Sequence, residues 1–374
     1  MGVGLMEHYL AHITLKSPAI IPRRRSARGY VGVKDSIPGS TLGGAVLSSL
    51  RRHNKIDTKE AEELVKSGGI ISSPAFPREK NKLYYPSHPF IWKCKQPGCR
   101  RYVTTIEKVL NLLETGSELS RDIIPLACDE GHRSPEKQQK PLPASTLLHG
   151  GRTDKDMDEC RELEFVESVR FVSVPVSRQR ASAIVGALYY YEALPTGLEY
   201  WAIVSVRESI VSEGSYEIRI GRGVSKGFGK ADLKFKKINL ERLQNKLTQK
   251  SGNIVLYTLS PAVFRDEDKV IDLRSYMGSA GKHSAGLLRI KSVYGVSERV
   301  GGWDVMRNSQ WRLDNASSPG SLVAAELEEG GEDCAYGLIS LGLQGMSLDF
   351  GEARLVGLNM MLPAKIVLGD VLAS

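Results

Sequence analysis

Residues 221–229 read GRGVSKGFG, a loop of four glycines between two strand-like stretches, 216–220 and 231–238. It is not a P-loop, because no Gly-Lys-Ser/Thr follows its last glycine. It is not a dinucleotide fingerprint, because Lys226 stands where the third glycine of GxGxxG belongs. Glycines let the backbone N–H groups come close to a polyanion, and Arg222, Ser225 and Lys226 add phosphate-binding side chains. Phe228 either stacks on a base or anchors the loop in the core.

The pattern of this loop returns near the C-terminus. Residues 223–233 read GVSKGFGKADL and residues 345–355 read GMSLDFGEARL, with Gly, Ser, Phe, Gly, Ala and Leu at the same offsets. Leu348 and Asp349 replace Lys226 and Gly227 in the second copy, which therefore lacks the phosphate-binding cation of the first. A βαββαβ-type unit used twice accounts for both copies, and it predicts an α+β protein.

The N-terminal part contains a helix start and a basic loop. In residues 37–52, IPGSTLGGAVLSSLRR, Pro38 and Gly39 predict a turn, Ser40 an N-cap, and the following apolar spacing a helix. The basic loop before it holds Arg23, Arg24, Arg25, Arg28 and Lys34. Farther along, residues 186–206, GALYYYEALPTGLEYWAIVSV, predict two strands joined as a hairpin around Pro195-Thr196-Gly197.

Residues 70–160 differ in composition, being rich in Pro, Lys, Ser and Cys, and we interpret them as an insertion into the first domain. Within them, Cys94-x4-Cys99 and Cys128-x3-His132 supply the four sulfur and nitrogen ligands that a tetrahedral structural zinc requires. Cys160 and His88 are substitute ligands. The alternative is four unconnected residues in a flexible insertion.

Composition limits the class of protein. The 374 residues are 41% hydrophobic and 25% charged, which excludes disordered and fibrous classes, and the net charge of +8 favours a polyanionic partner. The alternative is a basic surface that faces solvent and binds no particular partner. Five cysteines are too few and too uneven for a disulfide framework. The chain has no long apolar run and no signal-peptide pattern, so we expect a cytoplasmic protein without a membrane partner.

Taken together, the IPGS helix start and GRGVSKGFGKADL resemble the RAMP superfamily of CRISPR-associated proteins, whose members are built on ferredoxin-like (RRM-like) domains. Residues 176–204 resemble the basic segment and hairpin of that family. Residues 301–326, GGWDVMRNSQWRLDNASSPGSLVAAE, resemble the two-domain subunit that caps the 5′ handle of the guide in type III complexes, in its subtype III-D form. The resemblance implies two ferredoxin-like domains, 1–238 interrupted by the zinc-knuckle-like insertion 70–160, and a degenerate 239–374.

This resemblance also implies an antiviral-defence role in which the chain binds crRNA, especially its 5′ handle, beside backbone subunits and the large subunit, with target RNA contacted indirectly. One departure is Gly43, where family members often carry a Lys. The residues implied to line the RNA path are Arg23, Arg24, Arg25, Lys34, Ser40, Arg178, Arg180, Arg222, Ser225, Lys226 and Phe228.

We expect the chain to be non-catalytic, although two enzymatic alternatives stay open. Asp35 lies in the loop before the IPGS helix, where backbone subunits of the superfamily carry the Asp that cuts target RNA; there it either holds a metal or acts as base. A guide-processing endoribonuclease would instead use a histidine, and His8, His12 and His53 are the N-terminal candidates. The duplicated loop favours the capping subunit, because backbone subunits usually carry one such unit.

Overall fold

The structure is a computed structural model of the whole chain, and it has a mixed α/β fold made mostly of strands. Among the residues that it describes, no helix is both long and apolar enough to cross a membrane. The described residues are 6–26, 29–80, 82–125, 127–128, 130–132, 139–143, 146–149, 157, 160–163, 167–177, 179–180, 182, 184, 188–247, 252–277, 286–304, 309–328, 334–350, 353–369 and 372.

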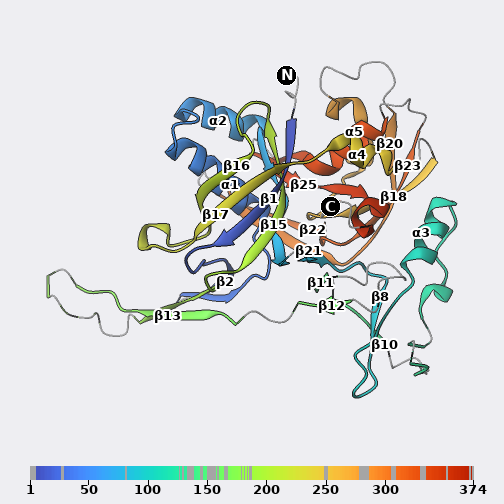
Figure 1. The fold of residues 1–374 in the computed structure, drawn as a ribbon, viewed down its shortest axis with the longest axis horizontal. Helices are drawn as coiled ribbons and strands as arrows, with labels where there is room; N and C mark the ends of the chain where they lie inside the picture. The colour runs from blue at the N-terminus through green and yellow to red at the C-terminus, as the bar shows by residue number, and fades with distance from the viewer. Residues whose placement is uncertain are drawn as a thin grey trace.

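A seven-stranded antiparallel sheet forms the first half of the molecule, with β1 (Met6–Leu15) near its centre (Figure 1). β1 pairs with β17 (Lys230–Lys237) on one side and with β15 (Glu199–Arg207) on the other. β15 is buried nearly throughout. The range 70–160 that we expected to be an insertion begins inside this sheet. The other strands are β16 (Gly214–Arg219) beyond β17, and β4 (Ile70–Ser72), β5 (Phe76–Glu79) and β6 (Lys82–Leu83) beyond β15.

Two helices, α1 (Gly39–Arg52) and α2 (Thr58–Ser67), pack apolar side chains against one face of this sheet. The predicted N-cap is wrong. α1 begins at Gly39 after Pro38 without a side-chain cap, and Ser40 lies exposed in its first turn. Pro38 takes the N-cap position with an extended ψ of 140°, and the next residue is a glycine packed against the Ser72 carbonyl of β4, where a Cβ atom would overlap it.

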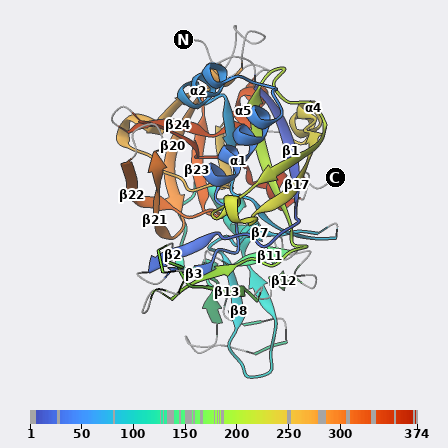
Figure 2. The same ribbon diagram turned by 90° about the vertical axis from the view of Figure 1, so that its left-hand side faces the viewer.

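A smaller, four-stranded sheet, here called the arm, lies below the first sheet (Figure 2). The predicted hairpin around Pro195 is wrong, because its two strands enter different sheets: β14 (Tyr189–Ala193) joins the arm and β15 the first sheet. The run of apolar residues in β15 suits a strand covered on both faces, whereas β14 is half-buried. In order, the arm strands are β13 (Val169–Ser173), β14, β3 (Gly29–Val33) and β2 (Pro22–Ser26).

The cysteine-containing region lies at the other end of the molecule from the arm strand β13 (Figure 1). Helix α3 (Ile106–Glu114) buries Ile106, Val109, Leu110 and Leu113 in the central core, so this region is anchored to the rest of the chain. Two small sheets accompany it: β10 (Gln139–Pro141), β8 (Ile91–Cys94) and β9 (Tyr102–Thr104), and β12 (Arg161–Glu162), β11 (Leu147–His149) and β7 (Tyr85–Pro86).

The C-terminal half is built on a second large antiparallel sheet with β18 (Gly252–Thr258) beside β23 (Leu322–Leu327). Helix α5 (Cys334–Gln344) is buried along its whole length except at two residues. In sheet order the strands are β19 (Val270–Asp272), β20 (Leu287–Tyr294), β23, β18 and β26 (Met361–Pro363). Two hairpins lie outside this sheet: β21 (Ser297–Asp304) with β22 (Ser309–Ser317), and β24 (Met346–Phe350) with β25 (Ala353–Leu358). The remaining helices of this half are α4 (Leu240–Asn245) and α6 (Ala364–Leu368).

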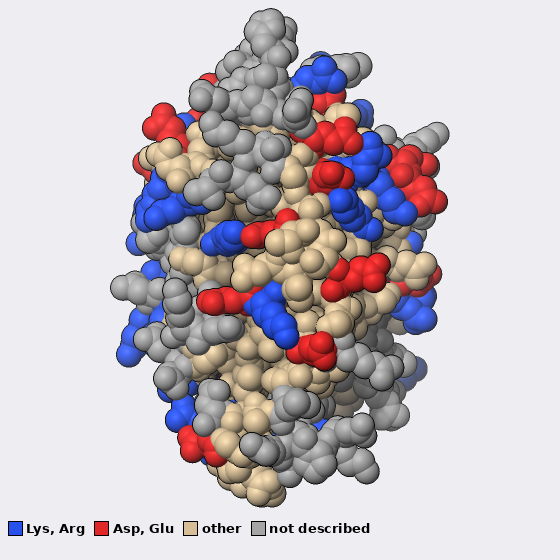
Figure 3. Space-filling model, turned by 90° about the vertical axis from the view of Figure 1, so that its right-hand side faces the viewer, with Lys and Arg blue, Asp and Glu red and all other residues tan. Residues whose placement is uncertain are grey.

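The two halves share one hydrophobic core. Its largest cluster joins Trp201 and Ile203 of the first sheet to Leu343 of α5 and Leu362 of β26. A buried hydrogen-bond chain crosses the same junction: His8 Nδ1 lies 2.7 Å from Ser205 Oγ, which donates to the Leu343 carbonyl at 2.8 Å. The face on the side of the second sheet and α3 carries interspersed charges of both signs (Figure 3).

Candidate nucleic-acid interface and candidate metal site

The glycine loop joins β16 to β17 through a single 3-10 turn, Val224–Lys226. Gly221, Gly223, Gly227 and Gly229 all have positive φ, from 72° to 92°, which an L side chain rarely adopts. At Gly221 and Gly229 a Cβ atom would also overlap the carbonyl oxygens of Ile20 and Ile220. The glycines are therefore needed for the path of the loop, whether or not a ligand binds it.

Lys226 extends from this loop onto the arm. Its ammonium donates to Tyr191 Oη at 2.9 Å and to Tyr189 Oη at 3.4 Å, and it lies 5.3 Å and 5.4 Å from the two ring centroids. The hydrogen bond to Tyr191, followed by that to Tyr189, raises the pKa of Lys226. Its side chain remains exposed, so a phosphate can approach a charge that two aromatic rings already hold in place.

Phe228 ties the loop to the arm. Its half-buried ring meets Phe171 of β13 edge-to-face at 5.0 Å and lies 6.1 Å from Tyr191. These contacts agree with the interpretation that Phe228 anchors the loop, although part of the ring remains accessible. The loop and the arm thus form one surface of cations and aromatic rings.

The other candidate residues that the structure describes are accessible to solvent, and a backbone contact ties Arg222 to the segment before the arm. Arg222, Ser225, Arg180, Lys34 and Ser40 are exposed or partly exposed. The backbone N–H of Arg222 donates to the Ile20 carbonyl at 3.0 Å, which places the loop beside the entry to β2. Arg23, Arg24 and Arg25 lie on β2, the strand of the arm farthest from β13. Arg28 and Arg178, and the side chains of Arg24 and Arg25, lie outside what the structure describes.

Sequence reasoning missed the aromatic part of this surface. Phe171, Tyr189 and Tyr191 face the loop, while Tyr190 lies under the Arg170 guanidinium, 5.4 Å from the ring centroid. The run Tyr189-Tyr190-Tyr191 directly after a basic segment was the available signal. It went unused because half of any strand's side chains normally face a core.

The acidic and histidine candidates for catalysis are each tied to a neighbour or partly buried. The Asp35 carboxylate accepts from the Arg23 guanidinium at 2.7 Å. His53 Nδ1 lies 2.9 Å from the Ser49 carbonyl. Burial lowers the pKa of His8 to about 4, and burial followed by the charges of Arg78, Lys236 and Lys234 lowers the pKa of His12 to about 4.

Cys94, Cys99, Cys128 and His132 come together, as their spacing predicted. Their ligand atoms all lie within 4.8 Å of one another, and the two cysteines Cys94 and Cys128 are buried. Gly98 and Gly131 have positive φ in the turns just before Cys99 and His132. This Cys₃His cluster could hold a metal ion.

The electrostatics of the cluster favour a thiolate at one position. Burial raises the pKa of the Cys128 thiol, but hydrogen bonds from the backbone N–H groups of His132 and Glu130 outweigh it and lower the pKa to about 7. Burial raises the pKa of Cys94. Cys128 Sγ also lies 3.3 Å from His132 Nδ1. The donor set fits a soft or borderline divalent cation, which would deprotonate the remaining thiols.

The two substitute ligands lie elsewhere. Cys160 is buried in a small apolar cluster with Ile91, Leu142 and Leu148. His88 is buried, and its Nδ1 accepts from the backbone N–H of Phe90 at 3.2 Å. Among the described residues, neither belongs to the group whose ligand atoms converge.

No family model and no curated protein matches the chain. Similar solved structures include one described as a type III-B Cmr-beta complex bound to cognate target RNA (12% identity, 84% of this chain and 86% of that chain, TM-score 0.46). A second is a Csm1-Csm4 cassette with AMPPNP (14% identity, 95% of this chain and 97% of that chain, TM-score 0.31). A third is Cmr4 (Cas7) of Pyrococcus furiosus (14% identity, 62% of this chain and 100% of that chain, TM-score 0.25). With TM-scores below 0.5, these likenesses carry no inference about what this chain binds.

Proposed function

We propose that this chain is a non-catalytic, guide-RNA-binding subunit of a type III CRISPR effector complex, of the RAMP superfamily and in its subtype III-D form. It seats the 5′ handle of the crRNA through phosphate and sugar contacts. It also contacts the neighbouring backbone subunits and the large subunit. The observation that carries the proposal is the Lys226 ammonium, held by Tyr189 and Tyr191 on the exposed surface that the glycine loop shares with the arm.

The chemistry of this surface supports binding of a single-stranded nucleic acid. Cations bind phosphates, while aromatic rings and positive-φ glycines let bases and backbone come close. Lys226 and Arg222 of the glycine loop supply charge, and Tyr189 and Tyr191 of β14 supply rings. The choice of RNA over DNA rests on the resemblance of the two sequence motifs to the superfamily.

The proposed domain structure is supported by strand order. In the first sheet, β17, β1, β15 and β4 have the order in space of strands 4, 1, 3 and 2 of a βαββαβ unit, and all their pairings are antiparallel. In the second sheet, β26, β18, β23 and β20 have the same order. We therefore interpret the chain as two ferredoxin-like domains, in which α1 and α5 occupy different crossovers.

The test is a titration of the purified full chain with end-labelled guide RNA and Mg²⁺, read on native and denaturing gels. Arg222→Ala with Lys226→Ala should weaken RNA binding about tenfold or more, because the double variant removes two cations that bind phosphates. Lys59→Ala with Lys66→Ala, on exposed α2, is the matched control. Equal binding by wild type and the glycine-loop variant would overturn the proposal.

The same gels test the enzymatic alternative. The proposal expects intact RNA, and Asp35→Ala should leave it intact. RNA cleavage that Asp35→Ala abolishes would make the chain a nuclease subunit instead. The Arg23–Asp35 ion pair gives that alternative no support, since it occupies the carboxylate with a cation partner.

We further propose that the Cys₃His cluster binds one structural zinc ion. The fit rests on the convergence of four ligand atoms in a region whose own apolar cluster is small. Zinc there would crosslink the turns at Gly98 and Gly131 and hold β8 near residue 132. Metal analysis of untagged protein should find about one zinc per chain, and Cys99→Ser should lose it. Protein without zinc would refute this assignment.

A further inference from the structure

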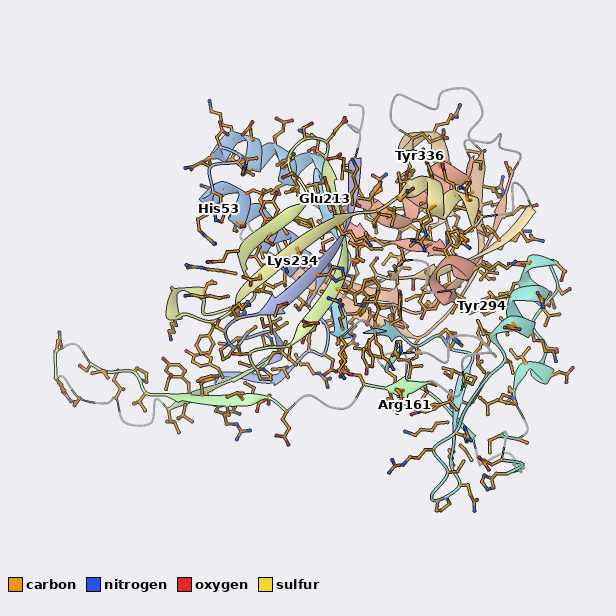
Figure 4. The ribbon with its side chains drawn as sticks, viewed as in Figure 1. His53, Arg161, Glu213, Lys234, Tyr294 and Tyr336 are labelled. Carbon is orange, nitrogen blue, oxygen red and sulfur yellow. The ribbon has the colours of Figure 1, made fainter. Side chains whose placement is uncertain are left out.

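On the face of the first sheet that α1 and α2 do not cover, β15 packs against the C-terminal half, but β17 stays exposed. On β17, Ala231, Leu233 and Phe235 point into the core beneath these helices, so the alternate residues Lys230, Asp232, Lys234 and Lys236 point to the opposite face. These three lysines are exposed, and Figure 4 labels Lys234 on its strand. They follow the glycine loop directly, because β17 begins at the residue after Gly229.

None of these three lysines has a carboxylate partner among the described residues. Elsewhere on the sheet, Lys16 pairs with Asp232 at 3.0 Å and Lys237 with Glu7 at 2.6 Å. Within the part of the chain that the structure describes, no ion pair is formed by Lys234 or Lys236. Unlike the mixed charges of Figure 3, they form a short cationic row, whose members lie about 6.6 Å apart along the strand.

His12 adds a neutral donor beside this row. It lies directly opposite Lys234 in the pairing of β1 with β17, and so on the same face. Its Nδ1 atom is buried without a hydrogen-bond partner among the described residues. We assign the single proton of the neutral ring to Nε2, because a buried N–H at Nδ1 would have no acceptor. The ring is half-buried, and Arg78 of β5 contributes a further positive charge nearby.

We infer that the exposed part of this face, formed by His12 of β1 with Lys234 and Lys236 of β17, is a second phosphate-binding site, which continues the RNA path from the glycine loop along β17. The ligand is the sugar-phosphate backbone of a single-stranded stretch of the same RNA. This inference rests on the proposed function. The lysines neutralise successive phosphates, and His12 Nε2–H donates a hydrogen bond to one of them.

The site predicts a dependence on RNA length. Single-stranded RNAs of about 4, 8 and 16 nucleotides are titrated against the full chain at several salt concentrations. Lys234→Gln with Lys236→Gln should leave the affinity for the shortest RNA unchanged and lower that for the longest by about five- to tenfold. The slope of log affinity against log salt should fall by about 1.4, or ~0.7 for each phosphate that a lysine no longer neutralises.

Two further variants separate direct phosphate binding from general charge. Lys59→Gln with Lys66→Gln removes the same charge from α2, on the other side of the sheet, and should change the affinity less than twofold. His12→Leu should weaken binding of the longest RNA without changing the salt slope, because a neutral donor releases no counterion. Lys234→Arg with Lys236→Arg should bind like wild type.

The outcomes distinguish this inference from the proposed function. If the glutamine variant matches the α2 control with the longest RNA while Arg222→Ala with Lys226→Ala loses binding, the inference is wrong and the function stands. If the glutamine variant loses equal affinity for short and long RNA, the lysines act as a diffuse field and the second phosphate-binding site is refuted. If the glycine-loop variant binds like wild type, both proposals fall.

Discussion

The two copies of the glycine motif, residues 223–233 and 345–355, share a pattern of glycine, serine, phenylalanine and leucine but differ in what surrounds it. In the first copy, Lys226 is exposed and extends onto the arm. In the second, the corresponding residue is Leu348, which is buried with Leu355 and Leu358 against hairpin β21–β22. The first copy is a loop with a 3-10 turn, whereas residues 346–350 of the second form strand β24 itself.

The difference shows that the repeated residues specify a chain reversal between strands and do not by themselves specify a ligand site. The ligand chemistry lies at the positions between them, where leucine replaces Lys226 and aspartate replaces Gly227. A copy without the cation can bury its side chain, because a hydrophobic residue gains about 25 cal/mol for each Å² removed from water. The predictions below test this division of roles.

The largest effect is expected from giving the second copy the cation of the first. Leu348→Lys places an ammonium where the side chain is 4% exposed, and we expect it to lower the free energy of unfolding by about 4 kcal/mol. Urea denaturation measures this. Leu348→Met, which nearly conserves volume, is the control and should cost less than about 1.5 kcal/mol. A Leu348→Lys protein as stable as wild type would show that the second copy is still a surface loop.

Acidification tests whether the halves that carry the two copies unfold together. The folded-state pKa of His8 is about 4, below its ordinary 6.5, so the unfolded chain binds this proton more readily between those values. Stability should therefore fall as pH drops from 6.5 to 4, by about 3 kcal/mol at most from His8. Thermal unfolding of His8→Asn should show a flatter pH profile in this window, with His12 as the residual titrating group. An unchanged profile would remove His8 from the link between the halves.

Two glycines of the first copy should respond differently to alanine. Gly229→Ala adds positive-φ strain and overlap with the Ile220 carbonyl, so we expect a loss of about 2–3 kcal/mol. Gly227→Ala adds strain alone, since nothing lies within 4 Å of its Cβ position, and should cost about 1 kcal/mol. Chemical denaturation of both variants gives the comparison. Equal losses of stability in the two variants would mean that the close approach of Gly229 to the Ile220 carbonyl does not contribute to the cost of the substitution.

The smallest effect is expected from adding a cation at Gly43. Gly43 lies in α1 with no atom within 4 Å of its Cβ position, so Gly43→Lys introduces there, without a clash, the residue that the proposed superfamily often carries. RNA affinity should rise about two- to threefold, which is under 1 kcal/mol. Gly43→Gln controls for the gain in helix propensity. A rise of the same size in both variants would show that charge at this position is not used.

Much of the metal cluster and part of the interface could be predicted from the sequence. Cys94, Cys99, Cys128 and His132 converge because each pair is local and each turn has its glycine. The glycine loop also lies between strands, as its flanks predicted. The N-cap predicted at Ser40 was wrong, since Pro38 takes that position and Gly39 packs against the Ser72 carbonyl, a contact between residues distant in sequence.

The sequence by itself determined the local features of this protein: the glycine loop, the helix after Pro38, the ligand pairs and the basic character of the surface. Only the tertiary structure decided that β14 and β15 part into separate sheets, that tyrosines of β14 hold Lys226, and that Leu348 enters a core. The physical reason is the distance along the sequence over which each feature is determined. Turns and helix starts depend on the conformations of a few neighbouring residues, whereas strand partners and burial depend on apolar surface contributed from across the whole chain.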